Sequence, residues 1–275
     1  MKELIWKIVF AVSVVAIVIA GINIAILNKE YRAGINEYSK LETMVEVKHE
    51  SEEPVLQAAN PIVATQEVEE VEDVIAFDME IDFEALRAIN EDLVGWIYYE
   101  PLELSYPIVR GNDNDYYTHY TFEKEQNSSA AIFMDFLNKP DFSHFNTIIY
   151  GHNMRNGTMF GSLKKLLADT SIIEKNPYFY IITEDKIFMY EIFAGYITVS
   201  TSHTYDFTQS LEEEQEYLNY IKDVATYYWD KDYLDVPITE ATEDNIKIAT
   251  LSTCHGLHST NRTVIHGLLI AQEDR

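Results

Sequence analysis

The stretch KIFMYEIFAGYITVS, residues 186–200, decides the fold class of this 275-residue chain. It is rich in β-branched and aromatic residues, which fit the pleated surface of a sheet. Seven further segments share this composition and are separated by turn-type residues: 94–99, 106–110, 130–134, 147–150, 178–183, 245–254 and 262–271. Such a series of short strands predicts a mainly β fold, a barrel or a sandwich, rather than a parallel α/β sheet.

Three helices are expected beside these strands. Ser210 and Glu213 have the spacing of a capping box, and apolar residues then recur at helical intervals, so a long helix follows. Asp82 is placed to cap a short helix at the start of the folded domain. A third helix is predicted at 159–167, with Thr158 as its cap.

The N-terminal segment 8–27 is apolar in all but three residues, and as a helix it spans about 30 Å, the thickness of a bilayer's hydrocarbon core. We expect a transmembrane anchor rather than a cleaved signal peptide, whose apolar region usually runs about 7–15 residues. Residues 1–7 are then a short cytoplasmic segment. The positive-inside rule places the rest of the chain outside the cell.

Residues 28–77 are rich in acids and lack a sustained apolar period, so they predict a solvated stalk that is disordered or partly helical. The catalytic domain is expected at 78–275. The formal net charge of −26 excludes a phosphate-binding surface, because nucleic-acid affinity rests on clustered Lys and Arg. We therefore expect no nucleic-acid partner.

Cys254 is the single cysteine, so it is a buried small residue, an intermolecular link or a reactive thiol, and composition alone favours the first. It ends the predicted strand 245–254, and Arg262 opens the next strand after seven residues. A hairpin would bring thiol and guanidinium to the same end of a barrel. There the cation would favour the thiolate and offer donors to an oxyanion. The alternative is that Arg262 is an ordinary surface residue.

Cysteine catalysis also needs a residue that moves protons, normally a histidine. His152 is the best candidate, since it follows the strand 147–150 through a glycine at an exposed strand end. The residues themselves leave the choice open, because His255, His258 and His266 are closer in sequence to Cys254. A zinc site made by these three histidines and the cysteine is disfavoured, because zinc ligands usually come in closely spaced pairs on two separate turns.

Several motifs resemble one family. The run Thr-Leu-Ser-Thr-Cys at 250–254 is similar to the Thr-Leu-x-Thr-Cys signature of sortases, and Arg262 stands where their essential arginine follows. The segment Ile-Tyr-Gly-His-Asn-Met at 149–154 resembles the histidine region of class B sortases. Further matches occur at 94–97, 106–109, 113–117 and 159–161, and the long helix after Ser210 is also a class B feature. The resemblance covers about residues 83–270.

The resemblance implies a sortase-type eight-stranded barrel with N-terminal helices, one long helix before the penultimate strand and a preceding transmembrane helix, on the surface of a Gram-positive bacterium. Cys254 would attack the carbonyl after the Thr of a C-terminal sorting signal to give a thioester. An amine of a peptidoglycan precursor would then resolve it. His152 would act as general acid and base, and Arg262 would stabilise substrate and oxyanion.

No cofactor and no metal are expected for this chemistry. We expect Ser252 and Thr253 to contact substrate, and we interpret His255 and His258 as loop residues. The partners are then surface proteins with a sorting signal, the precursor amine and, through residues 8–27, the membrane.

Two other functions compete with this one. A papain-like or cell-wall amidase hydrolase also pairs Cys with His, but it usually places the cysteine at the start of a helix rather than at the end of a strand. A non-catalytic membrane-tethered binding protein has no need of Cys254, His152 and Arg262 together.

Overall fold

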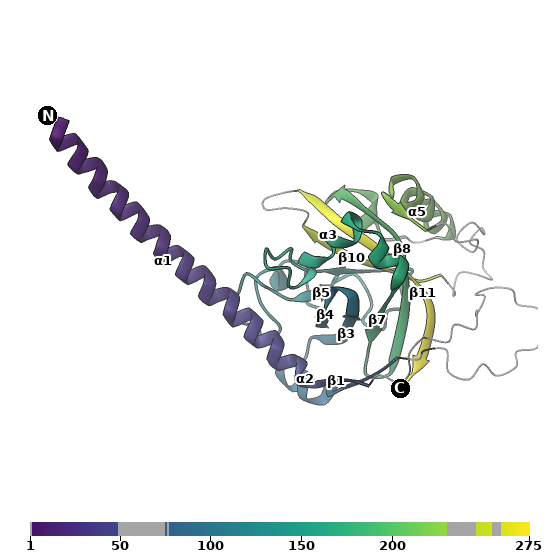
Figure 1. Ribbon diagram of the computed structural model, residues 1–275. Helices are drawn as coiled ribbons and strands as arrows, with labels where there is room; N and C mark the ends of the chain where they lie inside the picture. The colour runs from purple at the N-terminus through teal and green to yellow at the C-terminus, as the bar shows by residue number, and fades with distance from the viewer. Residues whose placement is uncertain (1, 49–74, 76, 209, 230–245, 255–259) are drawn as a thin grey trace, which may run out of the picture.

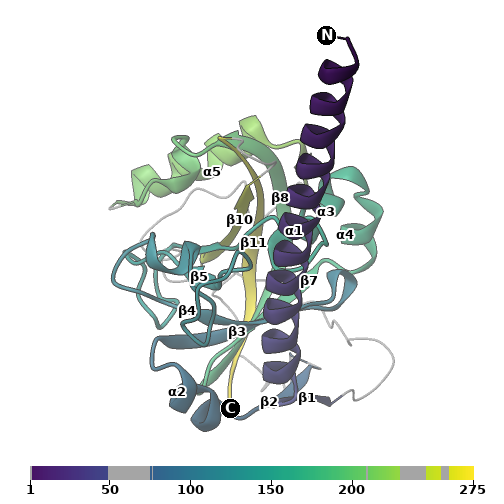
Figure 2. The same cartoon turned by 90° about the vertical axis from the view of Figure 1, so that its left-hand side faces the viewer.

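A computed structural model describes residues 2–48, 75, 77–208, 210–229, 246–254 and 260–275, with Cys254 described through its backbone. One long helix, α1 (Lys2–Glu42), projects from a β-barrel, and the two views of Figures 1 and 2 agree that only its C-terminal end meets the barrel. Among the described residues, α1 is the one helix long and apolar enough to cross a membrane. Its apolar residues from Ile8 to Leu27 are exposed, so the predicted anchor lies within this helix.

In the part of the chain that the structure describes, eight strands close into a ring. In ring order they are β11 (Asn261–Asp274), β10 (Ile248–Cys254), β6 (Asn146–Tyr150), β5 (Ile132–Met134), β4 (Leu104–Val109), β3 (Leu93–Tyr99), β7 (Tyr178–Ile182) and β8 (Lys186–Val199). Pairing of β8 with β11 closes the barrel. The two-residue strand β9 (Tyr227–Tyr228) adds to β8 from outside, and β1 (Val45–Lys48) pairs with β2 (Asp78–Ile81) in a separate ribbon.

The predicted mainly β barrel and its eight strands are confirmed, with shifted ends. β5 begins at Ile132 rather than at Ala130, because Ala130 has a φ of 55°, a left-handed conformation that cannot continue a pleated strand. β11 runs past the predicted end at residue 271 to Asp274, since its last residues pair with the start of β8.

Two of the predicted helices are confirmed with their caps. In α5 (Leu211–Val224) the Ser210 side chain accepts a hydrogen bond from the Glu213 amide, and this helix precedes β10, the penultimate barrel strand. In α2 (Phe83–Ile89) the Asp82 carboxylate accepts from the amide of Ala85 at 2.9 Å. Each cap satisfies an amide that the first helical turn leaves without a partner.

The single helix predicted at 159–167 is wrong. The chain forms a 3₁₀ turn, η3 (Phe160–Ser162), then α3 (Lys164–Ala168) and α4 (Ser171–Lys175), and Thr158 caps none of them. Met159 has a φ of 53°, which no right-handed helix contains. A Cβ on Gly161 would lie 2.5 Å from the carbonyl oxygen of Met154, so the turn is pressed against the preceding loop instead of extending as a helix.

The barrel interior is filled by large side chains, including the fully buried Trp96, Phe179 and Tyr190. A Cβ on Gly267 of β11 would lie 2.3 Å from the Phe179 ring, so this position requires glycine. A second buried cluster forms where α5 packs on the outer face of β8, β10 and β11. Burial on both faces explains why these strands are almost continuously apolar.

The beginning of the predicted stalk is helical and packed. The last three turns of α1 bury one face, in which Tyr31, Gly34, Tyr38 and Leu41 recur at helical spacing. The sequence shows this helical spacing, but not the surface on which the helix docks. Residues 49–74 of the predicted stalk lie outside the described residues, so its extent and the domain limits stay predictions.

Candidate active site

β10 and β11 pair antiparallel, as predicted from the sequence. The backbone of Cys254 pairs with that of Arg262, and Thr253 pairs with Thr263. The other edge of β11 pairs with β8 through thirteen residues, starting with Asn261 opposite Val199. The nucleophile predicted from the sequence therefore ends a strand anchored on both sides, and Arg262 lies directly across the ladder from it.

His152 is brought to this hairpin by a parallel pairing that sequence reasoning did not predict. β6 runs alongside β10, with Tyr150 opposite Ser252, and the amide of Gly151 donates to the carbonyl of Ser252 at 3.1 Å. A Cβ at Gly151 would meet the side chains of Ile132 and Phe160 at 2.4 Å and 2.7 Å, so only glycine fits where the chain leaves the strand. The next residue is His152.

One cavity of about 440 Å³ lies at this end of the barrel. His152, Arg262, Ser252 and Thr253, four of the residues predicted to act on substrate, line it together. Cys254 follows Thr253 directly at the end of β10. Residues from four separate segments, including Asn114, Asp135 and Tyr205, complete the wall. His255 and His258 lie outside the described residues, so their interpretation as loop residues stays a prediction.

The half-buried ring of His152 has its pKa lowered, first by burial and then by the nearby His119. The backbones of Thr118 and Ser128 act in the opposite direction. The imidazole is therefore mainly neutral near pH 7, and it can accept a proton from a thiol.

The chain is similar to known proteins in both sequence and fold. The sortase domain profile matches residues 97–270, and sortase B of Listeria monocytogenes is 35% identical over 191 residues, 68% of this chain and 73% of the relative. The chain belongs to the sortase family. Sortase B of Staphylococcus aureus is 32% identical over 190 residues, 68% of this chain and 74% of the relative. The crystal structure of sortase B from Bacillus anthracis matches with a TM-score of 0.65 at 27% identity, covering 88% of this chain and 98% of that one.

These relatives make the protein a class B sortase, an enzyme of the cysteine transpeptidase kind. The alternatives of a papain-like hydrolase fold and a non-catalytic barrel are therefore set aside. Membership of this family also gives the general function, which is transpeptidation of proteins at the cell surface.

The sortase has a polar wall in its cavity that sequence reasoning missed. Asp135 accepts hydrogen bonds from the Tyr150 hydroxyl at 3.0 Å, the Asn114 amide at 2.7 Å and the Leu137 backbone at 2.9 Å. Burial and the adjacent Asp135 raise the pKa of Tyr150, while the positive charge of Arg262 acts against them. The guanidinium is thus close enough to act on this wall. The signal for Asp135 was its place directly after the buried strand β5.

Next to Cys254, the predicted nucleophile, one buried hydroxyl is unpaired. Thr253 is 3% exposed, and its Oγ1 has no hydrogen-bond partner among the described residues. The neighbouring Ser252 hydroxyl instead bonds the Tyr205 hydroxyl at 2.8 Å. A buried polar atom without a partner costs free energy, so the Thr253 hydroxyl is available to a substrate group that enters the cavity.

Beneath the site, His266 is a structural residue rather than a ligand. The Thr250 hydroxyl donates to Asn146 Oδ1 at 2.7 Å, so His266 Nδ1–H must donate to Thr250 at 2.9 Å and Nε2 must accept from the Tyr196 hydroxyl at 3.0 Å. Burial lowers the pKa of His266 to about 3, so the ring is neutral. In the described residues no group of three metal-type ligands forms, and His266 has no free nitrogen for one.

The same network holds α5 and the short turn η4 (His203–Tyr205) against the barrel. The Tyr217 hydroxyl accepts from Asn146 Nδ2 at 2.7 Å and donates to the carbonyl of Thr204 at 2.9 Å. Tyr205, the next residue, is thereby held against Ser252. The buried network thus fixes one wall of the catalytic cavity.

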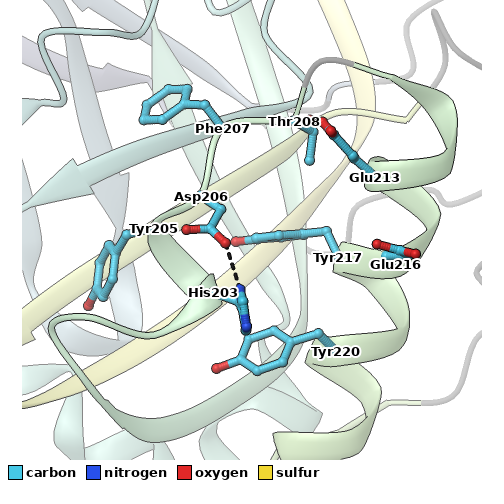
Figure 3. Close-up of a pocket in the computed structure, with 9 residues that line it drawn as sticks. All are labelled: His203, Tyr205, Asp206, Phe207, Thr208, Glu213, Glu216, Tyr217 and Tyr220. Atoms are coloured by element: carbon cyan, nitrogen blue, oxygen red, sulfur yellow. Dashed lines mark hydrogen bonds and ion pairs between the residues drawn. The ribbon is translucent and has the colours of Figure 1, made fainter.

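A second cavity of about 610 Å³ lies between η4 and α5 and shares Tyr205 and Phe207 with the first (Figure 3). His203 and Asp206 pair at 2.7 Å in its lining, and Glu213 and Glu216 line it from α5. None of the predicted catalytic residues lines it. It is larger than the first cavity, but His152 and Arg262, the predicted catalytic residues of the described lining, are in the smaller one.

Proposed function

We propose that this sortase cleaves a C-terminal sorting signal after threonine and transfers the surface protein to an amine of a peptidoglycan precursor. The observation that carries the proposal is the shared cavity: His152 and Arg262 line it, and Cys254 ends the strand that borders it. The family supplies the reaction type, and the cavity supplies the residues for each step.

The first half-reaction forms a thioester. The Cys254 thiol gives its proton to the neutral His152, and the sulfur attacks the carbonyl carbon of the signal's threonine. The peptide C–N bond breaks, and His152 returns the proton to the leaving amine. Arg262 stabilises the negative charge on the carbonyl oxygen, and its position opposite Cys254 in the hairpin supports that role.

The second half-reaction releases the product. The precursor amine attacks the thioester carbon, His152 takes a proton from this amine, and the C–S bond breaks to regenerate the thiol. The product is an amide between the surface protein and the cell-wall precursor. We propose that Ser252 and Thr253 bind the substrate backbone, supported by the unpaired Thr253 hydroxyl in the cavity.

We also propose that residues 8–27 of α1 cross the membrane once, with residues 1–7 in the cytoplasm and the barrel outside. The exposed, apolar first half of α1 supports this arrangement. Both substrates of the reaction belong to the cell surface, so an external catalytic domain suits them.

The experiment uses the full chain in detergent micelles, with a threonine-containing signal peptide and a supplied amine. We expect amide product from the wild type and none from Cys254→Ala, while His152→Gln and Arg262→Ala each lower kcat/KM by at least about 100-fold. Exclusive release of the free acid at high amine would contradict transpeptidation. Full turnover by His152→Gln would contradict its role as acid and base.

A further inference from the structure

The docked end of α1 contacts a loop that lies beside the proposed catalytic histidine. This loop, residues 119–130, folds back on itself: Tyr120 bridges Gln126, and the Asn127 amide donates to the carbonyl of His119 at 3.1 Å. His152 lines the same cavity as Thr118, the residue just before the loop, and the backbones of Thr118 and Ser128 and the His119 ring act on its pKa. The position of the loop therefore determines the surroundings of the ring.

Helix α1 forms hydrogen bonds to this loop at several positions. The carbonyl and the carboxylate of Glu30 accept from Asn127 Nδ2 at 3.0 Å and from the Ser128 amide at 2.7 Å. About two turns further on, the Glu37 carboxylate accepts from the Glu123 amide at 2.9 Å. These bonds join segments almost a hundred residues apart in sequence, so they position the loop through tertiary contacts.

Two further contacts leave little freedom at the end of the loop. The buried Tyr38 hydroxyl donates to the carbonyl of Ala130 at 2.5 Å, and Ala130 is the residue with left-handed backbone just before β5. A Cβ on Gly34 would lie 2.4 Å from Ser129 Oγ, so the helix and loop backbones approach as closely as glycine allows. Gly34 and Tyr38 lie on the same buried face of α1.

We propose that the membrane helix is also a positioning element for the reaction: through the loop at 119–130, Gly34 and Tyr38 of α1 hold His152 in its catalytic setting. Because α1 is one uninterrupted helix, the anchor and the histidine's surroundings form a continuous structure. The inference rests on the proposed role of His152, and Gly34 and Tyr38 touch neither substrate nor nucleophile.

The test uses the full-length protein in detergent micelles with three variants. Tyr38→Phe removes the hydroxyl and keeps the ring. Gly34→Ala favours the helix itself but pushes on Ser129, so it separates a positioning role from plain helix stability. Ser39→Ala is the matched control, because this exposed serine lies on the same turns of α1.

The readouts are kcat for thioester formation and the NMR titration of His152, whose C2–H signal is identified by its absence in His152→Gln. Charged groups around the ring are His119 on the loop, with Asp135 and Arg262 in the same cavity. We expect Tyr38→Phe and Gly34→Ala each to lower kcat about fivefold, equivalent to about 1 kcal/mol. The pKa of His152 should rise towards its ordinary value, because a looser loop admits water to the ring.

Wild-type kcat and titration in both variants would overturn the inference, as would a fall in kcat that only follows loss of folded protein without any change in the titration. Ser39→Ala should match the wild type in both readouts, and an equal effect there would also count against it. Failure of the proposed function is a separate result, since it would appear as an active His152→Gln variant.

Discussion

The buried His266 makes the stability of the barrel depend on pH in a way that can be calculated. In the folded protein burial lowers its pKa to about 3, against 6.5 for the free side chain. Between these two values the unfolded chain binds a proton that the folded chain does not. The free energy of unfolding is therefore highest above pH 6.5, and it decreases as the pH falls below that value. From pH 7 to pH 5 this one group lowers the free energy of unfolding by about 2 kcal/mol.

The assay is urea unfolding at pH 7, 6 and 5, followed by tryptophan fluorescence, to which Trp96, fully buried in the barrel, contributes the change on unfolding of the barrel. The many carboxylates of the chain also titrate, so the informative quantity is the difference between wild type and His266→Gln. We expect the wild type to lose about 2 kcal/mol more than the variant over this range.

Thr250→Val provides the control. It removes the hydroxyl that His266 Nδ1 bonds, so it should lower stability at every pH by about 1–3 kcal/mol. It keeps the buried imidazole, so the extra loss at low pH should remain. Equal losses in wild type and His266→Gln would refute the view that this ring is buried and neutral.

Three further predictions concern single side chains. Arg262→Lys keeps the charge but loses the planar fork of donors, so kcat/KM for a signal peptide should fall at least about tenfold, measured by amide product. Tyr205→Phe removes the bond to Ser252 at the cavity wall, and we expect KM to rise about threefold with kcat nearly unchanged. Gly267→Ala places a methyl 2.3 Å from the Phe179 ring and should destabilise the protein by about 1–3 kcal/mol in urea unfolding.

The barrel strands could be predicted because each strand is marked by the residue types within its own segment. Segments such as 186–200 and 94–99 bury side chains on the sheet surface, and β-branched and aromatic residues fit that surface whatever the topology. The cap of α5 was equally local, since Ser210 and Glu213 lie three residues apart. The broken helix at 159–167 could not be predicted, because the close approach of Gly161 to Met154 depends on how the loop folds.

In the site, too, features set by neighbouring segments could be predicted, and features set by distant segments could not. The pairing of Cys254 with Arg262 follows from a hairpin between consecutive predicted strands, so the sequence was sufficient for it. The approach of His152 depends on the parallel pairing of β6 with β10, which joins segments about a hundred residues apart and leaves no local pattern. Only the family resemblance selected this histidine. Asp135 was missed for the same reason, because its partners Asn114 and Tyr150 come from two other segments.

Docking of α1 on the loop at 119–130 was also outside the reach of local reasoning. The repeat of Tyr31, Gly34, Tyr38 and Leu41 has helical spacing, but it follows directly on the predicted membrane anchor and lies among acidic residues. Its partners, such as the carbonyl of Ala130, belong to a segment about ninety residues away. A close approach at a glycine is recognised only when both backbones are known.

The central claim is that Cys254 carries the acyl group between the two substrates, and intact-protein mass spectrometry tests it most directly. The full chain is incubated with a signal peptide in the absence of amine, then quenched in acid. We predict a mass increase equal to the part of the peptide that ends in threonine, lost on treatment with hydroxylamine and absent in Cys254→Ala. Peptide cleavage with no such adduct, or the same adduct on Cys254→Ala, would contradict the account.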